Sequence, residues 1–101
     1  MNIYLVSQDV NTGYDTYDSF VCVAENEDDA RTIHPSRFAT HIKDNKWMGT
    51  YSGGAQIGNE YILYDDSWVS LETAKTIPVT LIGVADISQK RGVILSSFNA
   101  G

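Results

Sequence analysis

Residues 20–35 read FVCVAENEDDARTIHP and carry the signals that set the fold. The apolar run 20–24 has valines at alternate positions, which is typical of a β-strand. Asn26 then stands where a helix N-cap is expected, with acidic residues in the first turn and basic ones in the last to complement the helix dipole. Pro35 ends this helix, because proline disfavours helical backbone in the residue before it. The stretch therefore predicts a strand followed by one short helix.

Upstream of this stretch, residues 3–7 predict another strand, which we expect to pair antiparallel with 20–24. The connection over residues 9–18 is rich in Asn, Asp and Gly, which favour turns. It is longer than a simple hairpin requires.

Downstream, residues 70–73 favour a single helical turn before Pro78, and residues 79–85 predict a strand. Residues 92–98 fit a strand, although their apolar side chains also fall at helical spacing. The β-branched Val93 and Ile94 favour the strand.

The middle of the chain, residues 37–68, is rich in aromatic residues and glycine. It predicts a hairpin in which 47–51 returns as 60–64, and whether this segment is ordered without a ligand stays open. The fold class expected is α+β: a small, mainly antiparallel β-sheet with one short helix packed on it and an aromatic, Gly-rich hairpin or loop insertion. Residues 1–101 are expected to form a single domain.

Charge and cysteine content narrow the possible partners. The chain has 13 Asp and Glu against 7 Lys and Arg, a formal net charge of −6, which opposes binding to duplex nucleic acid or to an anionic membrane. Cys22 is the single cysteine, so no internal disulfide can form, and we expect it to be a small buried hydrophobe. The first residues lack the basic start and the apolar length of a signal peptide, which favours a cytoplasmic protein.

Several rings and two arginines are candidate ligand contacts. Rings in flexible loops make stacking surfaces for bases, and arginine binds phosphate through paired N–H donors. The predicted site residues are Tyr14, Tyr17, Arg37, Trp47, Tyr51, Tyr61, Trp68 and Arg91. For any one ring the alternative is a place in the core, which is expected above all for Tyr4, Phe20 and Phe98.

The sequence contains few candidates for metal ligands or catalytic residues. Pro35 prevents a continuous helix from placing His34 and His41 on one side, and the chain has a single cysteine, so we expect no metal site. His34 is interpreted as a helix-end charge or cap and His41 as an exposed loop side chain. Ser96 and Ser97 lack the glycine elbow of a nucleophile. We therefore expect a binding protein without catalytic residues, metal or cofactor.

Four stretches carry a family resemblance: residues 4–8, 11–19, 24–35 and 91–101. Together they resemble a family of small uncharacterised proteins encoded by bacteriophages and prophages. The resemblance implies a counter-defence role in the cytoplasm of an infected bacterial host. In size, acidity and α+β composition the chain is similar to sponge proteins, which sequester cyclic oligonucleotide signals.

Two functions follow from these observations as hypotheses. In the first, a homo-oligomer captures a nucleotide-derived small molecule, with ligand contact depending on Trp47 unless that ring is part of the core. In the second, the chain is an acidic inhibitor of a host defence protein, a CRISPR or restriction nuclease, and imitates DNA with its carboxylates. The carboxylates considered are Asp15, Asp18, Glu25, Glu27, Asp28 and Asp29.

Overall fold

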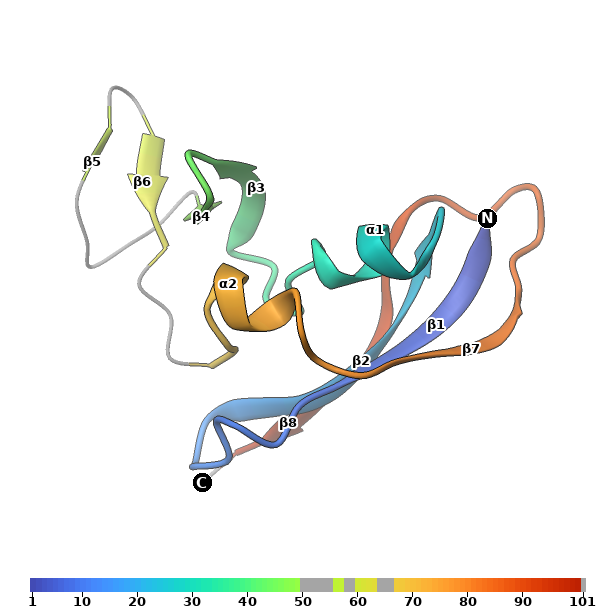
Figure 1. Ribbon diagram of the computed structural model, residues 1–101, viewed down its shortest axis with the longest axis horizontal. Coiled ribbons are helices and arrows are strands. Elements are labelled where there is room, and N and C mark those ends of the chain that lie inside the picture. The colour runs from blue at the N-terminus through green and yellow to red at the C-terminus, as the bar shows by residue number, and fades with distance from the viewer. Residues whose placement is uncertain (50–55, 58–59, 64–66, 101) are drawn as a thin grey trace.

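The computed structural model describes residues 1–49, 56–57, 60–63 and 67–100. Within this part, the strands form two four-stranded antiparallel sheets, accompanied by two short helices (Figure 1). The α+β class expected from the sequence fits this arrangement. The fold-class expectation named one sheet with one helix and a hairpin insertion, whereas the structure has a second four-stranded sheet, and the helical turn expected at 70–73 forms a second short helix.

The first sheet has the order β7-β1-β2-β8. Its central strands, β1 (Asn2–Ser7) and β2 (Thr16–Ala24), pair antiparallel as predicted, with Leu5 opposite Val21. β2 begins at Thr16, inside the stretch predicted to be a connection, because its first residues pair with the far end of the chain. Local sequence signals do not reveal a partner at such a distance.

The edge strands β7 (Val79–Val84) and β8 (Gly92–Asn99) agree with the predicted strands, and β8 is a strand rather than a helix. They are consecutive along the chain but lie on opposite edges of the sheet, since β7 pairs with β1 and β8 pairs with β2.

The helix α1 (Glu27–Arg31) starts as predicted, with the Asn26 side chain accepting the Asp29 N–H at 2.8 Å. It ends at Arg31, with Thr32 as its C-cap, before Pro35 is reached. The second helix, α2 (Leu71–Ala74), is the single turn predicted from 70–73, and Ser70 caps it by accepting the Thr73 N–H.

The second sheet has the order β3-β4-β6-β5. Its strands are β3 (Ala39–Lys43), β4 (Lys46–Gly49), β5 (Gln56–Ile57) and β6 (Glu60–Ile62). The pairing of β4 with β6 agrees with the predicted return of the chain, while the Gly-rich part of that hairpin and Tyr64 lie outside the described residues.

β3 was not predicted. It pairs with β4 through a tight turn in which Asp44 and Asn45 both take positive φ, the conformation of a type I′ hairpin turn. Asp and Asn tolerate this conformation better than other non-glycine residues, so the pair Asp44-Asn45 is the local signal for the hairpin.

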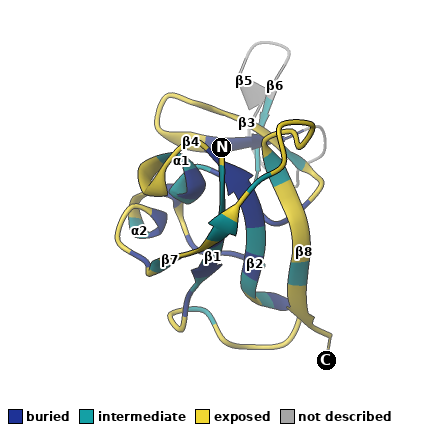
Figure 2. Ribbon diagram, turned by 90° about the vertical axis from the view of Figure 1, so that its right-hand side faces the viewer, coloured by how far each residue is buried: buried dark blue, intermediate teal, exposed yellow. Residues whose placement is uncertain are grey.

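The core fills the space between one face of the first sheet and the elements that cover this face, α1, α2 and β4 (Figure 2). Tyr4 and Phe20 are buried as expected, and Cys22 is the buried hydrophobe that the sequence predicted. Phe98 is exposed instead, because it lies near the end of an edge strand, and its ring contacts the Tyr17 ring in a tilted arrangement with centroids 4.7 Å apart. Neither described helix has the length or the apolar character to cross a bilayer.

Candidate functional site

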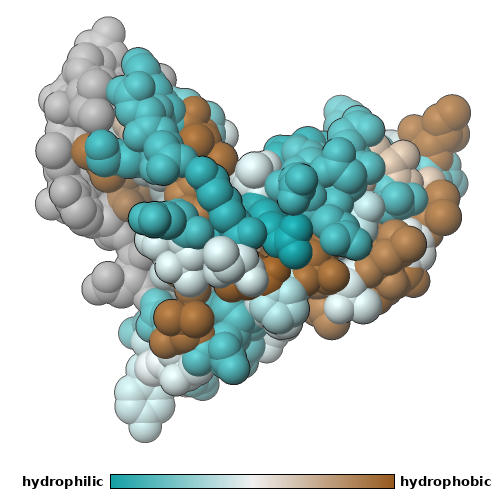
Figure 3. Space-filling view, viewed as in Figure 1, coloured by the Kyte–Doolittle hydropathy of each residue, from teal (hydrophilic) through white to brown (hydrophobic). Residues whose placement is uncertain are grey.

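A cleft of about 520 Å³ lies between residues 32–37, β3 and the start of β8. Figure 3 shows the surface indented between the part of the molecule that carries β3 and the part that carries α1. The volume is typical of a small-molecule site. The cleft-lining stretch 32–42 contains one arginine and two histidines but no Asp or Glu, so this region of an acidic chain can accept an anion.

The wall of the cleft includes two buried rings. His34 lies edge-on to Trp47, with centroids 5.0 Å apart, and its Nδ1 accepts the Ser36 N–H at 2.9 Å. A neutral imidazole that accepts at Nδ1 carries its proton on Nε2. The Trp47 indole N–H donates to the Val69 carbonyl at 3.1 Å, which holds the ring in one orientation.

Arg91 closes one end of the cleft and is held in place by α1. Its Nε donates to the Asp29 carboxylate at 3.0 Å, and its Nη2 donates to the Thr32 hydroxyl at 2.9 Å. The carboxylate compensates much of the arginine's charge. Within the described part of the chain Nη1 makes no hydrogen bond, so this nitrogen can donate to a ligand.

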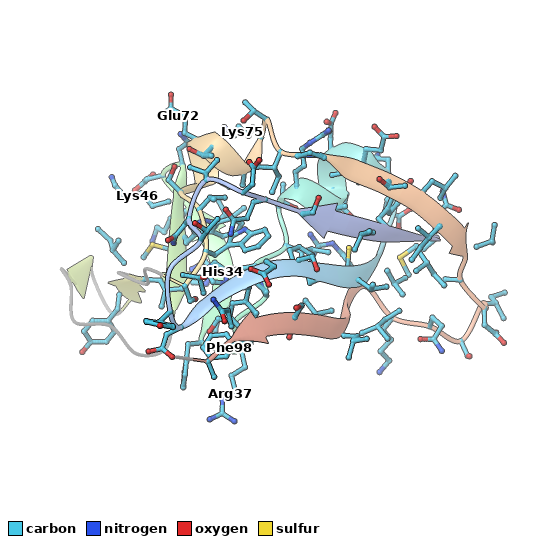
Figure 4. All side chains as sticks on the ribbon, turned by 90° about the horizontal axis from the view of Figure 1, so that it is seen from below. His34, Arg37, Lys46, Glu72, Lys75 and Phe98 are labelled. Carbon is cyan, nitrogen blue, oxygen red and sulfur yellow. The ribbon has the colours of Figure 1, made fainter. Side chains whose placement is uncertain are left out.

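Arg37 is the uncompensated cation of the cleft. Its guanidinium lies 5.1 Å from the centre of the Phe38 ring, and no Asp or Glu among the described residues pairs with it. In Figure 4 Arg37 points outward at the edge of the molecule, whereas His34 lies inside it. An exposed arginine supported by a ring is able to bind phosphate.

The opposite wall is polar. The Thr40 hydroxyl and His41 Nδ1 are 2.9 Å apart on β3. His41 therefore lies on a strand and not in the loop expected from the sequence. His34 was expected to be a charge at the end of the helix, and this prediction was wrong, because the helix ends at Arg31 and the His34 ring is buried.

The structure brings three predicted site residues together, Arg37, Trp47 and Arg91. Trp47 is 8% exposed, so it belongs to the core while lining the cleft. Trp68 is 3% exposed and packs on Phe20 at 5.2 Å, which leaves no ring face for a ligand, so the structure does not support it as a stacking platform.

The predicted tyrosines lie elsewhere. Tyr14 and Tyr17 are at the other end of β8, where Tyr14 is 80% exposed. Tyr61 lies on β6 opposite Gly49 and does not line the cleft, and Tyr51 is outside the described residues. The sequence interpretation missed that His34, Ser36 and Thr40 line the cleft. The signal that could have found them is that they are polar residues close to Pro35 and Arg37 in the sequence.

The six carboxylates of the alternative hypothesis form two groups at opposite ends of β2. Asp15 and Asp18 lie at its start, and the other four follow its end. Within the second group, Asp28 pairs with Arg31 at 3.2 Å and Asp29 with Arg91 at 3.0 Å. Two of the six charges are therefore already compensated.

Comparison with protein-family models, curated proteins and solved structures found no match to this chain. In the described part of the chain, no group of three or more His, Cys, Asp or Glu side chains is placed to hold a metal ion.

Proposed function

We propose that this chain is a non-enzymatic bacteriophage counter-defence protein that sequesters a nucleotide-derived immune signal, a cyclic oligonucleotide, in the cytoplasm of the infected host. The observation that carries the proposal is the cleft in which Arg37, Trp47 and Arg91 meet. The resemblance to small phage proteins supports the biological setting, and the cleft supports the ligand class.

Each part of such a ligand has a counterpart in the cleft. A phosphate fits the exposed Arg37 guanidinium and Nη1 of Arg91, because both offer N–H donors to oxygen. A base fits the wall made by His34 and Trp47, whose rings are held rigid by their hydrogen bonds.

A homo-oligomer is part of the proposal. A domain of 101 residues has little interior to spare for a ligand, and a site between subunits covers more of the ligand's surface.

The test is titration calorimetry of the purified protein against a panel of cyclic di- and trinucleotides. We expect at least one to bind at micromolar concentration, and Arg37→Ala to weaken it about tenfold or more. Lys75→Ala is the matched control, because it removes the same charge from an exposed side chain that bonds Asn45 outside the cleft. The absence of binding by every member of the panel would exclude the proposed ligand class.

The acidic inhibitor is the alternative, and the exposed Asp18, Glu25 and Glu27 at the two ends of β2 favour it. A pull-down from host lysate at low and high salt distinguishes the two functions. A stoichiometric nuclease partner that dissociates in high salt supports the inhibitor. A retained small molecule without such a partner supports the sponge.

The same titrations test for an enzyme. The Thr40 hydroxyl and His41 ring, 2.9 Å apart, are the nearest approach to a nucleophile and base in the cleft. Recovery of the bound nucleotide unchanged after prolonged incubation is the expected result. Conversion to a product would contradict the non-enzymatic proposal.

A further inference from the structure

β8 is an edge strand that lacks two of the usual protections against pairing, charged residues and proline. Within the described residues it pairs with β2 on one side only. Residues 92–100 contain no charged residue and no proline, the two residue types that most often block edge pairing. Leu95 and Ile94 are exposed on this strand, and Phe98 is half-exposed near its end. An edge of this kind is a template for another strand.

The other edge of the same sheet, β7, also exposes apolar side chains and contains no charged residue or proline, but a proline directly precedes it. β7 follows directly on Pro78, whose ring cannot donate a backbone hydrogen bond. The pairing of β7 with β1 shifts register once, at Ile82, whereas the pairing of β8 with β2 shifts register twice, once at Ile94 in β8 and once at Asp18 in β2.

The charges at the two ends of β8 are complementary. Lys90 precedes the strand, beside Arg91, whose charge Asp29 largely compensates, while Asp15 lies at the far end of the strand, where its N–H donates to the Asn99 carbonyl at 2.6 Å. In an antiparallel pair of two identical strands, the start of each lies beside the end of the other. Opposite charges therefore meet twice, around a neutral centre that avoids repulsion between two chains of charge −6.

We propose that two copies of this chain pair antiparallel through β8, and that each copy completes the cleft of the other. β8 has eight residues and so spans about 26 Å, which separates Tyr14 from the cleft within one chain. In the dimer the partner's residues 13–17 come to the Arg91 end of the cleft. The partner's Tyr14, 80% exposed in the single chain, is then placed to stack on a ligand.

The dimer stands independently of the proposed function, whereas the role of Tyr14 rests on it. The first experiment is sedimentation equilibrium of the protein without ligand. The full chain is expected to be a dimer at about 100 μM, and Ile94→Lys to raise the dissociation constant at least tenfold. Ile82→Lys is the matched control, because this isoleucine is the bulge residue of the other edge and is equally exposed, 52% against 53%.

A charge exchange tests the same dimer without the Ile94→Lys variant, so the test stands even if that variant does not fold. Lys90→Asp and Asp15→Lys should each weaken the dimer, and the double variant should restore it, because the pair forms between copies. A monomeric full chain, equal effects of Ile94→Lys and Ile82→Lys, or a double variant weaker than both single ones would each overturn the dimer.

The second experiment uses cyclic diadenosine monophosphate and cyclic triadenosine monophosphate as probes. Tyr14→Ala should weaken binding about tenfold without changing the sedimentation equilibrium, since one stacked base contributes on that order. Mixing Tyr14→Ala with Arg37→Ala should restore one intact site per mixed dimer. A dimer that binds neither probe rejects cyclic oligoadenylates as ligands, whereas a dimer that binds them equally well without Tyr14 rejects the shared site.

Discussion

The two tryptophans are both buried, but their indole N–H groups have different surroundings. The Trp47 N–H donates to the Val69 carbonyl, whereas the Trp68 Nε1 finds no acceptor within the described residues. A buried carbonyl that loses its donor is destabilising, while replacing an unpaired N–H removes no bond.

Trp47→Phe should therefore lower the free energy of unfolding by about 1–3 kcal/mol more than Trp68→Phe. In a domain of this size each kcal/mol shifts the melting temperature by about 4–8 °C, so thermal denaturation of the two variants measures the difference. Equal melting temperatures would show that the bond between Trp47 and Val69 contributes nothing to stability.

Cys22 lies in the core, and burial raises the pKa of its thiol from 9.0 to about 11. Nearby Arg91 lowers this pKa and Asp29 raises it, both less than burial does. In the unfolded chain the thiol loses its proton near pH 9, whereas the folded protein keeps it until about pH 11. The unfolded state then binds fewer protons, so stability falls as the pH rises through this interval.

Between pH 9 and 11 the free energy of unfolding should fall by roughly 2–3 kcal/mol through this group. Cys22→Ala is the control, because it lacks the thiol but keeps the tyrosines and lysines that titrate in the same range. Urea denaturation at several pH values measures both curves. Parallel curves for the two proteins would mean that the thiol does not link stability to pH.

At the scale of elements, β4 approaches the segment before β3 so closely that only glycine fits between them. A Cβ added at Gly49 would lie 2.5 Å from the Phe38 carbonyl oxygen and 3.0 Å from a Leu63 methyl carbon. The carbonyl belongs to the backbone and cannot turn away as a side chain does. This contact fixes the second sheet against the chain segment that carries Arg37.

Gly49→Ala should therefore destabilise the protein by about 1–3 kcal/mol and weaken ligand binding in the cleft. Gly13→Ala is the matched control, because its added Cβ would meet no atom within 4 Å. Chemical denaturation of both variants checks the first effect and calorimetry the second. A Gly49→Ala protein as stable as the control would mean that the strands shift without cost.

At the scale of the whole molecule, the charge is unevenly distributed. The first 30 residues contain seven Asp and Glu and no Lys or Arg, whereas residues 31–49 contain four Lys and Arg and a single Asp. An anion approaching the protein is repelled by its net charge and attracted locally by Arg37. Salt screens both the repulsion and the attraction, so its two effects on the affinity offset each other.

Raising the salt concentration from about 20 to 200 mM should change the affinity for a cyclic dinucleotide by less than about threefold. The alternative complex with a nuclease should instead weaken steeply over the same range. Calorimetry at the two concentrations checks the prediction. A fall of more than tenfold for the nucleotide would show that phosphate contacts dominate its binding.

The sequence by itself determined the elements whose signals are local. Asn26 marks the start of α1, the valines of 20–24 mark β2, and the β-branched residues of 92–98 mark β8, because capping and alternation act between near neighbours. The acidic charge and the burial of Cys22 also followed from the sequence.

Only the tertiary structure decided which of these elements meet. It extended β2 back to Thr16, placed β7 and β8 on opposite edges of one sheet, and put Trp47 in the core. It also joined Arg37, Trp47 and Arg91 around one cleft while leaving Tyr14 at the far end of β8. The physical reason is that these contacts join residues far apart in the chain, and packing between sheets, not local propensity, sets their positions.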